Sequence, residues 1–236
     1  MTVPVFNAQP ETVDEPLSGQ PALASWDRSG SPGQVRLAAF ITGVHRVIAQ
    51  RVSATPDPLA LKLDVGLPDS VSLLSYHDLD NYLFPLVPRL TASTGRQFVS
   101  VWATKRHAPT SSIAVGQGRV ASDPGGTYSF EVNTTAAAES TAFKEQIRDQ
   151  ITTAHPLPDG GVTLQLAFVV GPRRAWPNLW KATIDSLGSL LGRDAGAGQW
   201  KARDGRITDL GLHSAVDRHA GNRVVIAIRA SMARHR

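Results

Sequence analysis

The chain has no cysteine among its 236 residues. This absence excludes a disulfide framework, a thiol nucleophile and any zinc or iron–sulfur site built on cysteine. No apolar run approaches the roughly 20 residues that a bilayer span requires, and the N-terminal residues lack the basic-then-apolar order of a signal peptide. We therefore expect a cytoplasmic protein without a membrane partner.

Charged residues are also scarce, at 19% of the chain against 42% hydrophobic residues. This balance is typical of a globular rather than a disordered protein. Only five of the 24 basic residues are lysines, so arginine carries most of the net charge of +4. Arginine suits bidentate contacts with phosphate, and a basic balance favours a polyanionic partner. GC-rich coding would raise the arginine content equally, so an ordinary basic domain remains the alternative.

Hydrophobic periodicity divides the chain into two units after a proline-rich N-terminal segment. Residues 1–22 show no periodicity and are predicted to form a disordered or loosely packed arm. We place the first unit at residues 23–120 and the second at 121–236, with the junction in a stretch rich in Gly, Ser, Asp and Pro. The order helix, strand, loop, helix, strand, turn, strand recurs in both units, which favours an internal duplication. The alternative is one α+β domain whose halves resemble each other by coincidence.

The first unit begins with a clear amphipathic helix. From Gly33 onward Leu37, Ile41, Val44 and Ile48 form one apolar stripe, and Ser31-Pro32 suits a helix start. The remaining predicted elements are strands at 59–65, 97–104, 112–115, 128–132, 161–170, 207–212 and 223–229 and helices after residue 78 and at 142–151 and 178–188.

Two aspartates and an asparagine lie within four residues at the predicted start of the second helix. In an extended segment Asp78 and Asp80 project to the same side, and Asn81 follows directly. Capping of the helix would explain one of these residues, and this alternative stays open. A divalent cation relieves the repulsion between close carboxylates, and oxygen ligands suit Mg²⁺ or Mn²⁺. Because phosphodiester hydrolysis uses such a cation, the motif favours a phosphodiesterase site.

The second unit contains a lysine and two aspartates in a comparable position. Asn178-Leu-Trp-Lys181 opens the predicted helix, Asp185 follows one turn later, and Asp204 precedes the next strand. Lys181 lies one turn into its helix, from which its ammonium could reach an anion at the helix start. An ordinary solvated lysine is the alternative.

Two strings resemble the same stretch of the RusA family of Holliday-junction resolvases, namely Asp78-Leu-Asp-Asn-Tyr-Leu-Phe-Pro85 and Asn178-Leu-Trp-Lys-Ala-Thr-Ile-Asp-Ser-Leu187. The family stretch has Asp-x-Asp-Asn, a lysine three residues after the asparagine, a Leu-Asp-x-Leu helix end and an acidic turn. The resemblance covers most of residues 31–116 and 127–231. It implies an α+β fold of two tandem RusA-like repeats, each a small mixed sheet with two helices, arranged as a pseudo-dimer.

The resemblance also implies a function. RusA-like enzymes act as symmetric dimers that use magnesium to nick opposed strands of a four-way junction, in DNA repair and recombination. We therefore expect a DNA-binding protein that acts on branched DNA as a Mg²⁺- or Mn²⁺-dependent endodeoxyribonuclease. It would work as a monomer that mimics the dimer, or as a homodimer.

Neither unit keeps the complete family set. The first retains the acidic pair but has Phe84 at the lysine position and Pro88 at that of the helix aspartate, and it lacks the acidic turn. The second retains Lys181 and its aspartates but has Ala175 and Pro177 in place of the acidic pair. Each unit therefore keeps what the other has lost.

Three outcomes are open for the chemistry. The units could share one composite site, whose catalytic residues would be Asp78, Asp80, Lys181 and Asp204. The metal ligands in that site would be Asp78, Asp80 and Asp204. Alternatively, the first unit acts alone, or the chain is a catalytically inactive relative that binds branched DNA or serves as a scaffold for a protein partner.

Basic and amide side chains near strand and helix ends are candidates for contacts with DNA. They are Asn81, Lys105, Arg106, Arg173, Arg174, Asn178, Arg203 and Arg206. Two of them, Arg173 and Arg174, lie beside Trp176 and Trp180, and this combination suits phosphate contact and base stacking. A solvated arginine loop next to a core tryptophan is the alternative.

Overall fold

The computed structural model describes residues 2–24, 28 and 30–234. Its strands are β1 (Phe6–Asn7), β2 (Glu15–Pro16), β3 (Leu59–Leu67), β4 (Phe98–His107), β5 (Ser112–Gln117), β6 (Val120–Ala121), β7 (Tyr128–Thr134), β8 (Val162–Val170), β9 (Ile207–Val216) and β10 (Val224–Met232). Eight of them form one mixed sheet in the order β2-β5-β3-β4-β9-β8-β10-β7, and β1 pairs with β6. The α+β class is confirmed, but the strands of both units join one continuous sheet instead of two small ones.

The centre of this sheet is the antiparallel pair of β4 and β9. On one side β3 runs parallel to β4, and β5 pairs antiparallel with β3. On the other side β8 runs parallel to β9, and β10 pairs antiparallel with β8. The strands of the first unit therefore lie on one side of the central pair, and those of the second unit lie on the other in the same arrangement.

The helices are α1 (Pro32–Ala54), α2 (Leu79–Thr94), α3 (Thr141–Arg148), α4 (Trp180–Asp185) and α5 (Gly188–Leu191), with 3₁₀ turns η1 (Trp176–Leu179) and η2 (Asp204–Arg206). α1 begins as predicted, because the Ser31 side chain accepts a hydrogen bond from the Gln34 amide at 3.3 Å. Its predicted apolar stripe is buried. The single helix expected at 178–188 is wrong: the segment divides into η1, α4 and α5, with a break at Ser186 and Leu187.

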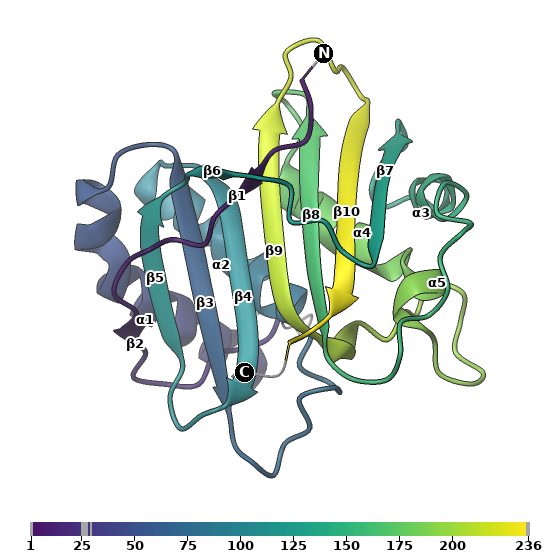
Figure 1. Cartoon of the computed structure of the whole chain (residues 1–236). Helices are drawn as coiled ribbons and strands as arrows, with labels where there is room; N and C mark the ends of the chain where they lie inside the picture. Colours follow the sequence, from purple (N-terminus) through teal and green to yellow (C-terminus); the bar gives the residue numbers. More distant parts are fainter. Residues whose placement is uncertain (1, 25–27, 29, 235–236) are drawn as a thin grey trace.

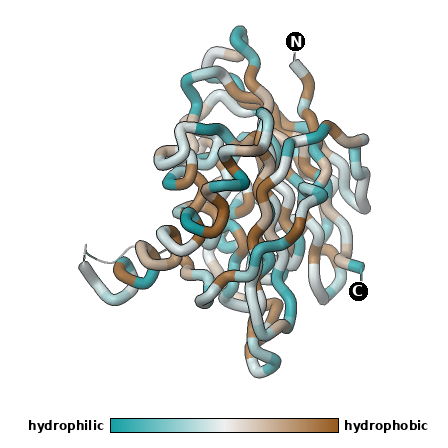
Figure 2. The backbone as a smooth tube through the Cα atoms, turned by 90° about the vertical axis from the view of Figure 1, so that its left-hand side faces the viewer, coloured by the Kyte–Doolittle hydropathy of each residue, from teal (hydrophilic) through white to brown (hydrophobic). Residues whose placement is uncertain are grey.

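The helices and the sheet form two layers. Figure 1 shows α1, α2 and α4 behind the sheet, and the side view in Figure 2 shows the helical layer to the left of the strands. One large hydrophobic core fills the space between them. A small second core of Phe6, Ala167 and Ala227 lies where β1 crosses the opposite face. Within the described residues, no helix has the length and apolar character needed to cross a membrane.

The N-terminal segment differs from the prediction of a disordered or loosely packed arm. β1 pairs with β6, and β2 pairs with β5 at the edge of the large sheet. Phe6 and Asn7 are buried, and Leu17 joins the main core. Proline and polar residues hide these contacts from a periodicity search, because each strand is only two residues long.

Candidate active site

Six charged side chains gather at the end of the sheet where β4 ends and β9 begins (Figure 1). They come from the start of α2, the end of β4, the helix α4 and the turn η2. The six, called the Asp–Lys cluster, are Asp78, Asp80, Lys105, Lys181, Asp185 and Asp204. Their charges shift the pKa values within the cluster, so acids of the first unit and residues of the second occupy one site.

Lys181 connects the two aspartates that the second unit supplies to the Asp–Lys cluster. Its Nζ donates to Asp204 Oδ2 at 2.8 Å and to Asp185 Oδ1 at 3.0 Å. Burial opposes the charge of Lys181, but nearby carboxylates, that of Asp80 first, outweigh burial and raise its pKa above the ordinary value of 10.5. Lys144 binds the other oxygen of Asp185 at 2.7 Å. Lys181 therefore stays charged and joins α4 to η2.

Asp80 is the most deeply buried acid of the cluster. Its side chain lies in the first turn of α2, and the residue is only 2% exposed. Among the described residues its Oδ2 finds no hydrogen-bond partner. Burial raises the pKa of Asp80 to about 7, although the charge of Lys181 acts in the opposite direction. An unpartnered buried carboxylate is costly, so this oxygen marks a place where a ligand or cation would gain binding energy.

Asp78 stands immediately before α2 but does not act as a conventional helix cap. Its side chain makes no cap hydrogen bond, and its Oδ2 instead accepts one from Asn81 Nδ2 at 2.9 Å. Burial and the charge of Asp204 raise the pKa of Asp78 above its ordinary value, while Lys181 and Lys105 act against this. Capping therefore does not account for the first acid of the motif.

Lys105 connects the two units through backbone carbonyl groups. Its Nζ donates to His77 O at 2.7 Å and to Gly205 O at 2.5 Å. The residue is 3% exposed, and burial lowers its pKa to about 8 against the attraction of the nearby aspartates. The expectation that Lys105 contacts DNA from a strand end is therefore wrong, because its ammonium points into the cluster.

A tight backbone approach holds the two units together at this point. A Cβ on Gly205 would lie only 3.2 Å from Leu74 O, so a glycine lets η2 pack against the loop before α2. In the same loop Tyr76 has a φ of 63° and is 89% exposed. The loop thus places an exposed aromatic side chain two residues before Asp78. Sequence reasoning missed Tyr76, although a tyrosine beside the acidic motif was a usable signal.

The other residues predicted to contact DNA lie in varied surroundings. Arg106, Arg173 and Asn178 are exposed. Arg174 is half-buried and donates to Ala136 O at 2.6 Å. Arg203 forms ion pairs with two surface aspartates, Asp159 and Asp194. Arg106, Arg173 and Asn178 thus remain the accessible candidates for a contact with phosphate, together with the half-buried Asn81.

Arg206 corrects the prediction for its position. It is 1% exposed, and its guanidinium donates to Leu157 O and Gly160 O at 3.0 Å each, to Leu191 O at 3.2 Å and to Pro158 O. The group thus satisfies carbonyl groups of the loop before β8 and of the last residue of α5. Arg206 is a structural residue that cannot reach DNA.

Replacing Arg206 with methionine is expected to reduce the free energy of unfolding by about 3 kcal/mol or more, because it leaves buried carbonyl groups unpaired. Replacing the neighbouring Arg203 with methionine, which removes only surface ion pairs, is expected to cost less than about 1 kcal/mol. Urea unfolding of both variants measures the difference. Equal losses would contradict the structural role of Arg206.

The cluster can be compared with the needs of Mg²⁺ or Mn²⁺. Mg²⁺ is commonly held by one or two carboxylates together with water and substrate phosphates. Asp80 Oδ2 is unpartnered and Asp78 lies beside it, whereas Asp204 is engaged by Lys181. In the described part of the chain, no three Asp, Glu or His side chains converge as a ready-made metal centre. The residues therefore fit an ion on Asp78 and Asp80 that is completed by the substrate.

Comparisons with known proteins give no further guide to this site. A scan of the sequence against models of protein families finds no match. A search of curated proteins finds no significant match either.

Proposed function

We propose that this protein binds branched DNA, four-way junctions in particular, and cleaves a phosphodiester bond with the help of Mg²⁺ or Mn²⁺. The observation that carries the proposal is the Asp–Lys cluster, in which Asp78 and Asp80 of the first unit meet Lys181 and Asp204 of the second. Carboxylates for a hard cation and an ammonium group for phosphate charge, that of Lys181 here, are the parts that phosphodiester hydrolysis requires.

The two units are tandem RusA-like copies that pair as the subunits of a dimer would. The mirrored strand order on the two sides of β4 and β9 supports this interpretation. The complementary losses support it too, because Phe84 and Pro177 stand where a second cluster would need a lysine and an acid. One chain then contains one complete site, so a monomer suffices for activity.

Each residue of the cluster has a role in this proposal. Asp78 and Asp80 hold the cation, which stabilises the charge on the phosphate when bound. Lys181, fixed between Asp185 and Asp204, places an ammonium where negative charge grows on the phosphate oxygens. Lys105 holds the two units in register through its carbonyl contacts.

Exposed side chains at more than one part of the sheet supply the contacts with DNA. Arg106 would bind a phosphate at the end of β4, and Asn178 would add a neutral contact at η1. Arg173, which follows β8 at the opposite end of the sheet, would bind a phosphate farther along the DNA. Tyr76 offers a ring for stacking on a base next to the cleavage point.

One observation favours a second candidate function, a catalytically inactive protein that binds DNA or another protein. Lys181 already neutralises Asp204 and Asp185, and the pKa of Asp80 near 7 lets this acid be protonated. With Asp80 protonated and Lys144 paired with Asp185, three lysines balance the three remaining carboxylates without a divalent cation, as a structural network would.

Binding to a labelled four-way junction tests the proposed function. Counterion release predicts that three phosphate contacts weaken binding about 40-fold between about 50 mM and about 200 mM salt. Fluorescence anisotropy gives the affinity for the junction and for a duplex of equal length. Tighter binding to the junction with a steep salt dependence supports the proposal, and no binding at low salt would favour the scaffold.

A further inference from the structure

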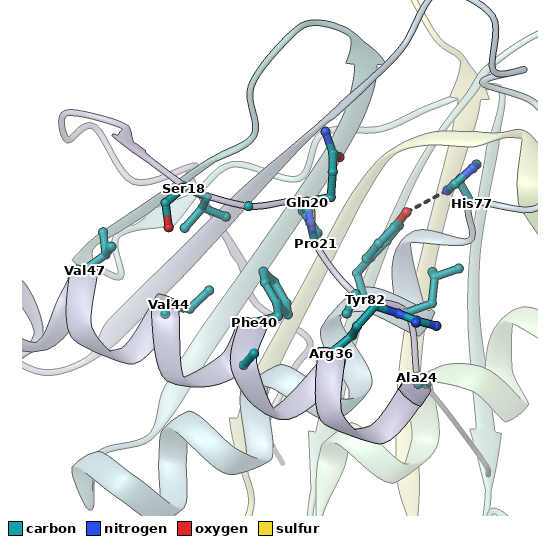
Figure 3. A pocket seen from close by; sticks show the side chains of 17 residues that line it. Ser18, Gln20, Pro21, Ala24, Arg36, Phe40, Val44, Val47, His77 and Tyr82 are labelled. Atoms are coloured by element: carbon teal, nitrogen blue, oxygen red, sulfur yellow. Dashed lines mark hydrogen bonds between the residues drawn. The ribbon is translucent and has the colours of Figure 1, made fainter. Parts of the chain in front are cut away.

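A pocket of about 950 Å³ is lined at one end by His77 and Tyr82, which flank Asp78 and Asp80 of the Asp–Lys cluster in the sequence. Helix α1 forms its floor, residues 17–24 form one wall, and the start of α2 closes one end (Figure 3). This volume lies within the range of pockets that hold small organic molecules.

The floor of the pocket is apolar. Phe40, Val44 and Val47 follow one another along α1 (Figure 3), and Leu23 of the N-terminal segment also lines the pocket. A Cβ added to Gly43 would meet nothing within 4 Å, so the helix leaves open space at this point. The pocket can therefore accept the face of a flat, weakly polar ring.

The end near α2 is polar. His77 Nδ1 and Tyr82 Oη are hydrogen-bonded at 2.7 Å, and their rings are parallel within 8°. Gln20 lines the same end, and Arg36 extends towards it from α1 (Figure 3). Arg36 is exposed, and no residue in the described part of the chain pairs with its guanidinium. Charge complementarity at this end therefore favours an anion.

The pocket and the cluster share the first turn of α2. His77 precedes Asp78, and its carbonyl group accepts the hydrogen bond from Lys105. The pocket wall is attached to the same turn, because the Ala24 amide donates to Asn81 O at 2.8 Å. A DNA strand with one phosphate at the cluster would thus place its neighbouring nucleotide at the mouth of the pocket.

We propose that the pocket binds one unpaired nucleotide of the DNA strand held at the Asp–Lys cluster. The base lies against Phe40, and Arg36 binds the adjoining phosphate. A base within a stacked duplex cannot enter, so the pocket selects strands with an unpaired nucleotide next to the scissile bond. This inference rests on the proposed function and specifies its substrate.

The probe is a four-way junction with one unpaired 2-aminopurine at the branch point, compared with the same junction fully paired. The unpaired junction is expected to bind about tenfold more tightly, and its 2-aminopurine fluorescence is expected to change on binding. Anisotropy and fluorescence are read from the same sample. Equal affinities, or a probe signal that binding leaves unchanged, would overturn the inference while the proposed function stands.

Variants of α1 locate the nucleotide. Phe40→Ala, Arg36→Gln and the pocket-filling Gly43→Leu are each expected to remove the preference for the unpaired junction. Gly43→Leu also replaces glycine with a better helix former, so it keeps α1 folded. Arg46→Gln is the matched control, since Arg46 is an exposed α1 arginine outside the pocket lining. If Gly43→Leu still prefers the unpaired junction, the inference is overturned. If the wild-type protein binds neither junction, the proposed function itself is refuted.

Discussion

Replacing Asp80 with asparagine is expected to abolish Mg²⁺-dependent cleavage and, at the same time, to stabilise the folded protein near pH 7.5. Cleavage falls by at least about a hundredfold, the size of effect seen when one charge-stabilising group is removed from a site. The amide keeps the shape of the side chain but cannot hold a cation as a carboxylate does. Cleavage that persists in this variant would remove the first unit from the chemistry.

The stability change follows from the buried carboxylate. The pKa of Asp80 is about 7 in the folded protein because of burial, against an ordinary value of 3.8. Between these values folded Asp80 binds more protons than Asp80 in the unfolded chain, so its contribution to stability falls as the pH rises from about 4 to about 7. Each pKa unit corresponds to about 1.4 kcal/mol, so asparagine gains on the order of a few kcal/mol at pH 7.5.

Urea unfolding in EDTA at pH 5 and pH 7.5 measures this change, and comparison of the variant with the wild type removes most of the contribution of Lys105, whose pKa of about 8 lies close to the upper pH. The stability gained by Asp80→Asn over the wild type is expected to be larger at pH 7.5 than at pH 5. Comparing the two proteins is necessary because burial lowers the pKa of His213 to about 3, which makes both proteins more stable as the pH rises from 5. An Asp80→Asn protein that is less stable than the wild type at pH 7.5 would contradict the assignment of Asp80 as an unpaired buried acid.

A second large effect on the cleavage rate is expected when Lys181 of the second unit is replaced. Lys181→Met removes the ammonium that binds Asp185 and Asp204 and that attracts Asp80. We expect it to lower the cleavage rate as far as Asp80→Asn does, because both residues belong to one site. It also destabilises the protein, since carboxylates remain without their partner.

Lys181→Arg provides the control for charge. Arginine keeps the positive charge and is expected to restore most of the stability. Its planar guanidinium, however, contacts a phosphate differently from the compact ammonium of lysine. Rates are measured on an end-labelled four-way junction and divided by the folded fraction. Wild-type cleavage per folded Lys181→Met molecule would exclude the second unit from the site.

Local patterns in the sequence predict many of the helices and strands. The stripe from Leu37 to Ile48 predicts α1, and the serine before it caps the helix as expected. The single helix predicted at 178–188 is wrong because the helical period of its apolar residues does not reveal the break at Ser186 and Leu187.

The site depends on contacts that no local pattern reveals. The acidic motif at Asp78 and the lysine at position 181 could be recognised separately, but they are about 100 residues apart. They meet because β4 and β9 pair at the centre of the sheet. Contacts between segments distant in the sequence also explain the two wrong positions. Lys105 and Arg206 look like surface cations in the sequence, but both are buried, and their side chains donate to backbone carbonyl groups of other segments.

The most direct measurement is the cleavage rate of the double variant Asp80→Asn, Lys181→Met beside the two single variants. Residues that act as a unit give strongly non-additive losses, so the double variant is expected to cleave no more slowly than either single one. It is also expected to be more stable than Lys181→Met alone, because one opposing charge is removed from each side of the cluster. Two separate sites would instead leave about half of the cleavage in each single variant and none in the double, and that result would contradict a site shared by the two units.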